Sequence, residues 1–311
     1  MYYKTKEGIF MNAQKKNLLN KIALLAVVAL LGGNMASPIS AFANETEAEA
    51  AANEIIYYDD FIYEDGPYQG QGTHTSVDYT INCDEMIIED GAARPSAPSY
   101  GNNDSSMTNV CGPVAGTNLV VYYDQWATNL IPNFEPGMVT SGGSYRYYPD
   151  IDWAQTNAVI ASLYNLMRVP EVGGTTSANF KSGLNSYVTG QGYTISYTSC
   201  YASSTTLNLA TLKTAINAGK VALLMCSQYN FIYAVHDYTD EGNVFFTQHN
   251  STVGHMMMVY GYKTLGYYSN GVKVGEDTFL LVSSGYSSDV QGYMRLNAFS
   301  VIDEAWITYI S

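Results

Sequence analysis

The sequence predicts an α+β protein in which an N-terminal helical half packs against a C-terminal antiparallel sheet. Hydrophobic residues make up 47% of the 311 residues, which is enough for a substantial core. After residue 104, segments with helical periodicity come first and short alternating or apolar runs come last. This order, helices followed by strands, is typical of α+β proteins.

Four segments have the apolar spacing of helices. The first begins at Cys111, and Pro113 suits its first turn because the missing proline N–H is not needed there. Thr176 or Ser177 can cap the third helix, and Gly219 ends the fourth. The predicted helices cover residues 111–126, 153–167, 176–187 and 209–218.

Six later segments predict strands. The segment 221–226 is a continuous apolar run, typical of a buried strand, and 193–198 alternates between apolar and polar residues. Turn residues separate the others. The predicted strands cover residues 193–198, 221–226, 244–247, 255–263, 278–283 and 292–296.

The first 43 residues have the pattern of a secretory signal peptide. Lys15, Lys16 and Lys21 form a basic region, residues 22–31 are apolar, and Ala41-Phe42-Ala43 fits a cleavage site. The apolar stretch is about ten residues, too short for the roughly 20 that a membrane-spanning helix needs. We therefore expect cleavage near Ala43 and a secreted mature protein without a membrane span.

The acidity of the chain is concentrated in one segment. The formal net charge is -14, and residues 44–104 hold 14 acidic residues against one base, Arg94. A Pro/Gly/Asn-rich stretch over residues 94–103 predicts a boundary between this acidic flank or pro-segment and a domain over residues 105–311. No basic cluster lies outside the N-terminus, which argues against a nucleic-acid partner.

The cysteines and histidines do not predict a metal site. No two of the four cysteines, Cys83, Cys111, Cys200 and Cys226, have C-x-x-C spacing, and the four histidines do not complete a zinc pattern with them. We therefore predict neither a metal nor a cofactor. Cys226 lies in an apolar run, where a buried thiol is expected.

Cys111 and His255 are the candidate catalytic pair. Cys111 is expected at a helix N-terminus, where the helix dipole and unpaired N–H groups stabilise a thiolate and can also hold an oxyanion. His255 opens a predicted strand and can supply the base that a cysteine nucleophile needs. His249 is a rival base, but it lies in a polar turn where we expect solvent exposure.

Three stretches of the sequence carry a resemblance to known cysteine peptidases. Residues 109–119 (NVCGPVAGTNL) resemble the catalytic Cys-Gly-Pro helix of C39-like, papain-fold cysteine peptidases, and residues 254–262 (GHMMMVYGY) are similar to their histidine strand. Residues 292–299 resemble the end of streptopain-like peptidases. The resemblance implies a papain-like fold over residues 105–311. It also implies hydrolysis of a peptide or protein substrate, with Cys111 as nucleophile and His255 as general base and then acid.

The third catalytic position departs from the family pattern. The family places Asn or Asp after the strand that follows the histidine, and here that place falls on Ser283, or on Ser284 if the strand is one residue longer. Asp289 is an alternative from the following loop. Tyr286, where related chains have Trp, either shields the catalytic pair from water or packs on the core.

The oxyanion position also departs from the family pattern. Ser105 stands where papain-like enzymes carry a glutamine, and the side-chain amide of Asn109 is the substitute candidate. These departures leave two alternatives to a peptidase open. One is a catalytically degenerate module that binds peptides or a cell-surface partner, and the other is a different thiol chemistry such as amide transfer.

Overall fold

The computed structural model describes most of the chain from residue 73 onward. The predicted signal peptide and the first part of the acidic flank lie outside the described residues. The described ranges are residues 73–94, 97–102, 106–127, 129–134, 138–141, 144–147, 153–203, 206–286 and 291–311.

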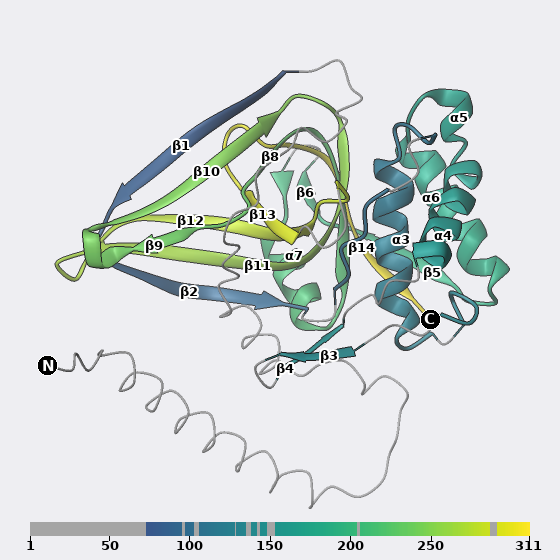
Figure 1. Ribbon diagram of the computed structural model, residues 1–311, viewed down its shortest axis with the longest axis horizontal. Coiled ribbons are helices and arrows are strands. Elements are labelled where there is room, and N and C mark those ends of the chain that lie inside the picture. The colour runs from purple at the N-terminus through teal and green to yellow at the C-terminus, as the bar shows by residue number, and fades with distance from the viewer. Residues whose placement is uncertain are drawn as a thin grey trace, which may run out of the picture. The chain divides into compact units, whose positions relative to one another are not determined.

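Ten strands in the described part of the chain form one antiparallel sheet. They are β1 (His74–Asn82), β2 (Glu85–Ala93), β5 (Ile195–Ser199), β8 (Val221–Phe231), β9 (His236–Tyr238), β10 (Asn243–Ser251), β11 (His255–Ser269), β12 (Val272–Ser283), β13 (Gln291–Arg295) and β14 (Val301–Ile310). The central path runs β1-β10-β8-β11-β12-β13 (Figure 1). β14 pairs with β5 and β8, β2 with β11, and β9 with β10.

The helices lie on both sides of this sheet. They are α3 (Cys111–Asp124), α4 (Trp153–Leu166), α5 (Val169–Val172), α6 (Ser177–Gly190) and α7 (Leu209–Asn217), with two small hairpins, β3 (Met138–Ser141) with β4 (Ser144–Tyr147) and β6 (Tyr201–Ser203) with β7 (Thr206–Leu207). The helices α3, α4 and α6 pack together beside the sheet, whereas α7 packs on β2, β8 and β11 (Figure 1). None of the helices in the described ranges is long and apolar enough to cross a bilayer.

The predicted fold class is wrong. Strands β1 and β2 precede the first described helix and belong to the same sheet as the later strands, so the chain has no N-terminal helical half packed on a separate C-terminal sheet. The structure is mostly antiparallel sheet, not the papain-like α+β architecture expected from the sequence. Gly261 helps to make this sheet continuous, because a Cβ there would lie 2.7 Å from the Ala92 carbonyl oxygen of β2.

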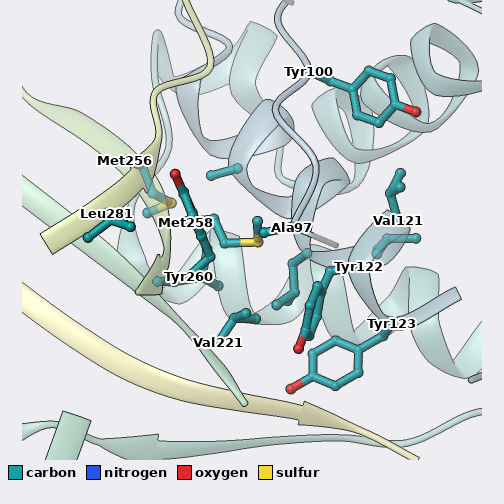
Figure 2. Close-up of a cluster of buried hydrophobic side chains, with 14 of the residues drawn as sticks. Ala97, Tyr100, Val121, Tyr122, Tyr123, Val221, Met256, Met258, Tyr260 and Leu281 are labelled. Carbon is teal, nitrogen blue, oxygen red and sulfur yellow. The ribbon is translucent and has the colours of Figure 1, made fainter. Parts of the chain in front are cut away.

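Alternate residues of β11 belong to two different cores. Met256 and Met258 pack in the core that contains Tyr122 of α3, as Figure 2 shows. Met257 packs in the core that contains Leu212 of α7. The three consecutive methionines therefore serve packing on both faces of the strand. The arrangement places the first residues of β11 close to the start of α3.

Part of the segment that joins β2 to α3 is buried. Residues 97–100 are buried, and the backbone of Tyr100 forms two hydrogen bonds with the Asn118 side chain of α3, at 2.7 and 3.1 Å. Lys213 of α7 also donates to Asp90 of β2 at 2.6 Å. The described part of the acidic flank is therefore bonded to both sets of helices and adds two strands to the sheet.

Candidate catalytic site

Cys111 is the first residue of α3, as predicted. Asn109, two residues earlier, has a φ of 57°, and this left-handed turn leads the chain into the helix. The N-cap residue is Val110, and no side chain caps the helix. The N–H groups of the first turn are therefore left for other acceptors, which is the arrangement that favours a negative charge at this end.

The Cys111 sulfur faces the backbone at the start of β11. Burial raises the pKa of the Cys111 thiol. The backbone N–H groups of Met256, Gly112 and Cys111 itself act in the opposite direction and lower this pKa. Because the Met256 nitrogen is bonded to the carbonyl carbon of His255, the sulfur lies against the backbone of the predicted base.

His255 opens β11 and its ring is held by a backbone carbonyl. The Nε2 atom lies 2.8 Å from the Ser284 carbonyl oxygen. A carbonyl oxygen only accepts hydrogen bonds, so Nε2 carries the proton and donates. The bare nitrogen of the neutral ring is then Nδ1, the ring nitrogen nearer to the His255 backbone.

Two tyrosines stack on the His255 ring. Tyr286 is stacked on the ring with a centroid distance of 4.7 Å and an interplanar angle of 2°, and Tyr229 is stacked on it at 4.9 Å and 29°. His255 is 9% exposed. Burial lowers the pKa of His255 to about 4, and the hydrogen bond to Ser284 opposes this shift in part. The imidazole is therefore neutral at neutral pH.

The two candidate serines have different surroundings. The Ser283 hydroxyl donates to the Pro98 carbonyl oxygen at 2.5 Å, and this bond ties the end of β12 to the segment before α3. The Ser284 hydroxyl accepts from the Tyr286 N–H at 3.3 Å. The group that forms a hydrogen bond with the His255 ring is the Ser284 backbone carbonyl.

The remaining predicted residues are not part of this cluster. Asn109 is exposed, and no hydrogen bond connects its side chain to Cys111 or His255. Ser105 and Asp289 lie outside the described residues. His249 is half-buried rather than exposed, and its Nδ1 is 2.9 Å from Ser76 Oγ on β1. Among the contacts of the described residues, the Cys111 sulfur and the His255 ring share no hydrogen bond.

Two parts of the site have no clear signal in the sequence. Tyr229 lies beyond residue 226, where the predicted strand ends, and only the longer β8 brings it beside His255. The Ser284 carbonyl is a backbone group, so residue type does not reveal it. In the described part of the chain, no group of three or more His, Cys, Asp or Glu side chains is placed to hold a metal ion.

Comparisons with protein-family models, with curated proteins and with solved structures found no match to this chain.

Proposed function

We propose that this chain is a cysteine hydrolase that cleaves amide bonds of peptides, with Cys111 as nucleophile and His255 as base. The observation that carries the proposal is the position of the Cys111 sulfur, which lies at an uncapped helix N-terminus and against the residue that follows His255. The motif resemblance to C39-like peptidases favours peptides as the substrate class.

The protonation states favour general-base catalysis. Burial raises the pKa of Cys111 and lowers that of His255 to about 4, so the resting pair is a neutral thiol and a neutral imidazole. Such a pair reacts by moving the thiol proton to the imidazole as the sulfur attacks. Catalytic hydrogen bonds are often long in unliganded sites and shorten when substrate binds.

The proposed reaction balances with these two side chains and one water molecule. The Cys111 proton moves to Nδ1 of His255 while the sulfur bonds to the substrate carbonyl carbon. The N–H groups at the start of α3 receive the oxyanion. The amine then leaves with the proton from His255, and water, deprotonated by His255, hydrolyses the thioester to release the acid.

A mixed peptide library incubated with the protein and analysed by mass spectrometry tests this proposal. The chain should begin at Asn44, because β1 and β2 belong to the sheet and a chain cut at residue 105 would lose them. We expect cleavage by the wild type and none by Cys111→Ala. Cleavage that persists in Cys111→Ala, or a wild type that cleaves no peptide, would contradict the proposal.

Export is part of the same proposal. The signal peptide predicted over residues 1–43 would place the enzyme outside the cell, where it meets extracellular peptides. Sequencing the N-terminus of the protein recovered from culture medium should give a start near Asn44. Retention of the uncleaved chain inside the cell would contradict this part.

A non-catalytic peptide-binding module is the second candidate. It is favoured by the two tyrosines stacked on the His255 ring and by the lack of a hydrogen bond between the Cys111 sulfur and this ring among the described contacts. In that case the library peptides would bind equally well to the wild type and Cys111→Ala, and neither protein would cleave them.

A further inference from the structure

The turn that follows β12 holds the imidazole of His255. β12 ends at Ser283, and the Ser284 carbonyl oxygen then points back to Nε2 of His255 at 2.8 Å. Gly285 follows with a φ of 74°, in the left-handed region that favours glycine. The direction of the Ser284 carbonyl is set by the Ser284–Gly285 peptide, so the conformation of Gly285 helps to fix it.

Gly285 also touches the helix that carries the nucleophile. A Cβ built on Gly285 would lie 2.9 Å from Cγ1 of Val114, which stands three residues after Cys111 in α3. Real Cβ atoms essentially never approach this closely. The turn can therefore pack against α3 at its present distance only if residue 285 has no side chain.

We propose that Gly285 is a positioning residue, which aims the Ser284 carbonyl at His255 and so leaves Nδ1 as the base for Cys111. A carbonyl oxygen accepts a hydrogen bond from Nε2–H as the side-chain oxygen of an asparagine would, without adding a charge. The orienting group is thus the main chain, held by one glycine that also sets the approach of α3. This inference rests on the proposed function for its role in catalysis, but not for its geometry.

The tautomer of His255 in the wild-type protein is the first test. Histidine labelled with ¹⁵N shows which ring nitrogen carries the proton, because only Nε2 couples strongly to both carbon-bound ring protons. The His255 signal can be assigned from its loss in His255→Gln. We expect a protonated Nε2 and a bare Nδ1 at pH 7. A protonated Nδ1 would overturn the inference.

Gly285→Ala is the second test, and Gly271→Ala is its matched control. Gly271 has a φ of 73°, nearly the same as Gly285, but nothing lies within 4 Å of a Cβ built there. In Gly285→Ala we expect the Nε2-protonated form to give way to a mixture, and alkylation of Cys111 by a peptide-based thiol probe to slow roughly 10-fold or more. Gly271→Ala should keep the wild-type tautomer and rate.

A double variant separates the effect on the His255 tautomer from a failure to fold. In Gly285→Ala combined with Val114→Ala, the clashing Cγ1 atom is absent and the left-handed strain remains. We expect this double variant to fold and still to show the mixed tautomer. A wild-type tautomer and labelling rate in both Gly285 variants would overturn the positioning role.

Different results would contradict the hydrolase proposal and the positioning role of Gly285. If the wild type has the Nε2-protonated ring but Cys111 is not labelled, the peptidase proposal fails and the orienting turn stands. If Cys111 is labelled but the ring is protonated on Nδ1, the hydrolase proposal stands and the orienting turn fails.

Discussion

The rings of His255 and Tyr286 lie parallel, with centroids 4.7 Å apart and an interplanar angle of 2°. Tyr286 follows the turn whose carbonyl holds His255 Nε2, so a single short segment both orients the imidazole and covers one of its faces. Water excluded by this cover would otherwise favour the charged imidazolium. The stacked tyrosine therefore helps to keep the proposed base neutral.

Replacing Tyr286 should change the protonation of His255. In Tyr286→Ala, water reaches one face of the ring, and we expect the pKa of His255 to rise from about 4 toward the ordinary value of about 6.5. Tyr286→Phe keeps the stacked ring and should leave the pKa low. An NMR titration of the His255 ring protons measures both. If the pKa of His255 stays near 4 in Tyr286→Ala, the stacked Tyr286 ring is not the group that excludes water from the imidazole.

The Ser283 hydroxyl should matter for stability and not for the state of His255. It donates to the Pro98 carbonyl at 2.5 Å and is 1% exposed, so Ser283→Ala leaves a buried acceptor without its donor. We expect a loss of about 1–2 kcal/mol in the free energy of unfolding, measured by denaturant titration. The Nε2-protonated tautomer should persist. If the tautomer changes in Ser283→Ala, the orienting group is the hydroxyl and not the Ser284 carbonyl.

Gly112 should be required for α3 to start where it does. A Cβ on Gly112 would lie 2.5 Å from Oγ1 and 2.7 Å from Cβ of Thr175. We expect Gly112→Ala to cost about 1–3 kcal/mol of stability by overpacking and to slow the labelling of Cys111. Adding Thr175→Gly removes the clashing atoms and should restore the labelling rate.

The neighbouring Gly174→Ala is the matched control, because nothing lies within 4 Å of a Cβ there. It should behave as the wild type. Thermal unfolding compares the stability of the wild type, Gly112→Ala, the double variant with Thr175→Gly, and Gly174→Ala. A Gly112→Ala protein as stable as Gly174→Ala would refute the close contact with Thr175.

Lys263 should destabilise the fold at neutral pH. It is 2% exposed and lines a small apolar cavity with Met86, Val235, Leu265, Phe279 and Tyr293. Among the described residues its only marked contact is with the Tyr293 ring, whose centroid is 5.6 Å from Nζ. Burial lowers the pKa of Lys263 to about 8, against about 10.4 in an unfolded chain.

The sign of the pH dependence follows from these two values. Between about pH 8 and pH 10.4 the unfolded chain binds more protons, so stability rises with pH in this window. Below about pH 8 both states are protonated and the full penalty, about 3 kcal/mol, applies. We therefore expect Lys263→Met to be more stable than the wild type at pH 7 and to lose the rise above pH 8.

Lys213→Met is the control for this experiment. Lys213 is partly exposed and donates to Asp90 at 2.6 Å, so its loss should cost up to about 1 kcal/mol and not increase stability. Denaturant unfolding at pH 7 and pH 10 compares the variants. A Lys263→Met protein that is less stable than the wild type at pH 7 would contradict the account.

The helices were predictable because their signals are local. Apolar spacing, Pro113 and the Thr176 cap gave starts at or next to those observed for α3, α4, α6 and α7. The Thr176 side chain does accept the Asn179 N–H, as a cap should. Such signals depend only on residues close in the sequence, so they do not require knowledge of how distant segments pair.

The sheet was predicted only in part because its signals depend on pairing. Six strands were expected, but β14 was missed, since its register on β8 shifts twice between Val301 and Glu304 and the alternation is broken there. β1 was missed because it is mostly exposed and polar, as befits an edge strand that pairs only with β10. These omissions produced the wrong fold class.

In the candidate site, too, the features with local sequence signals were predictable and those that depend on strand pairing were not. Cys111 at a helix start and His255 at a strand start were predicted from residue type and local pattern. The Ser284 carbonyl and the Tyr229 ring reach His255 only through β12 and β8, two strands that flank β11. A backbone acceptor has no residue-type signal, so the sequence indicates only side chains for the third position.

The most direct test of the account is the rate at which a peptide-based thiol probe alkylates Cys111, followed by intact mass and peptide mapping. We predict a single adduct, on Cys111, in the wild type, no adduct in Cys111→Ala, and labelling slowed roughly 100-fold or more in His255→Gln. An unlabelled Cys111 in the folded wild type, or equal rates in the wild type and His255→Gln, would contradict the claim that these two residues act as a catalytic pair.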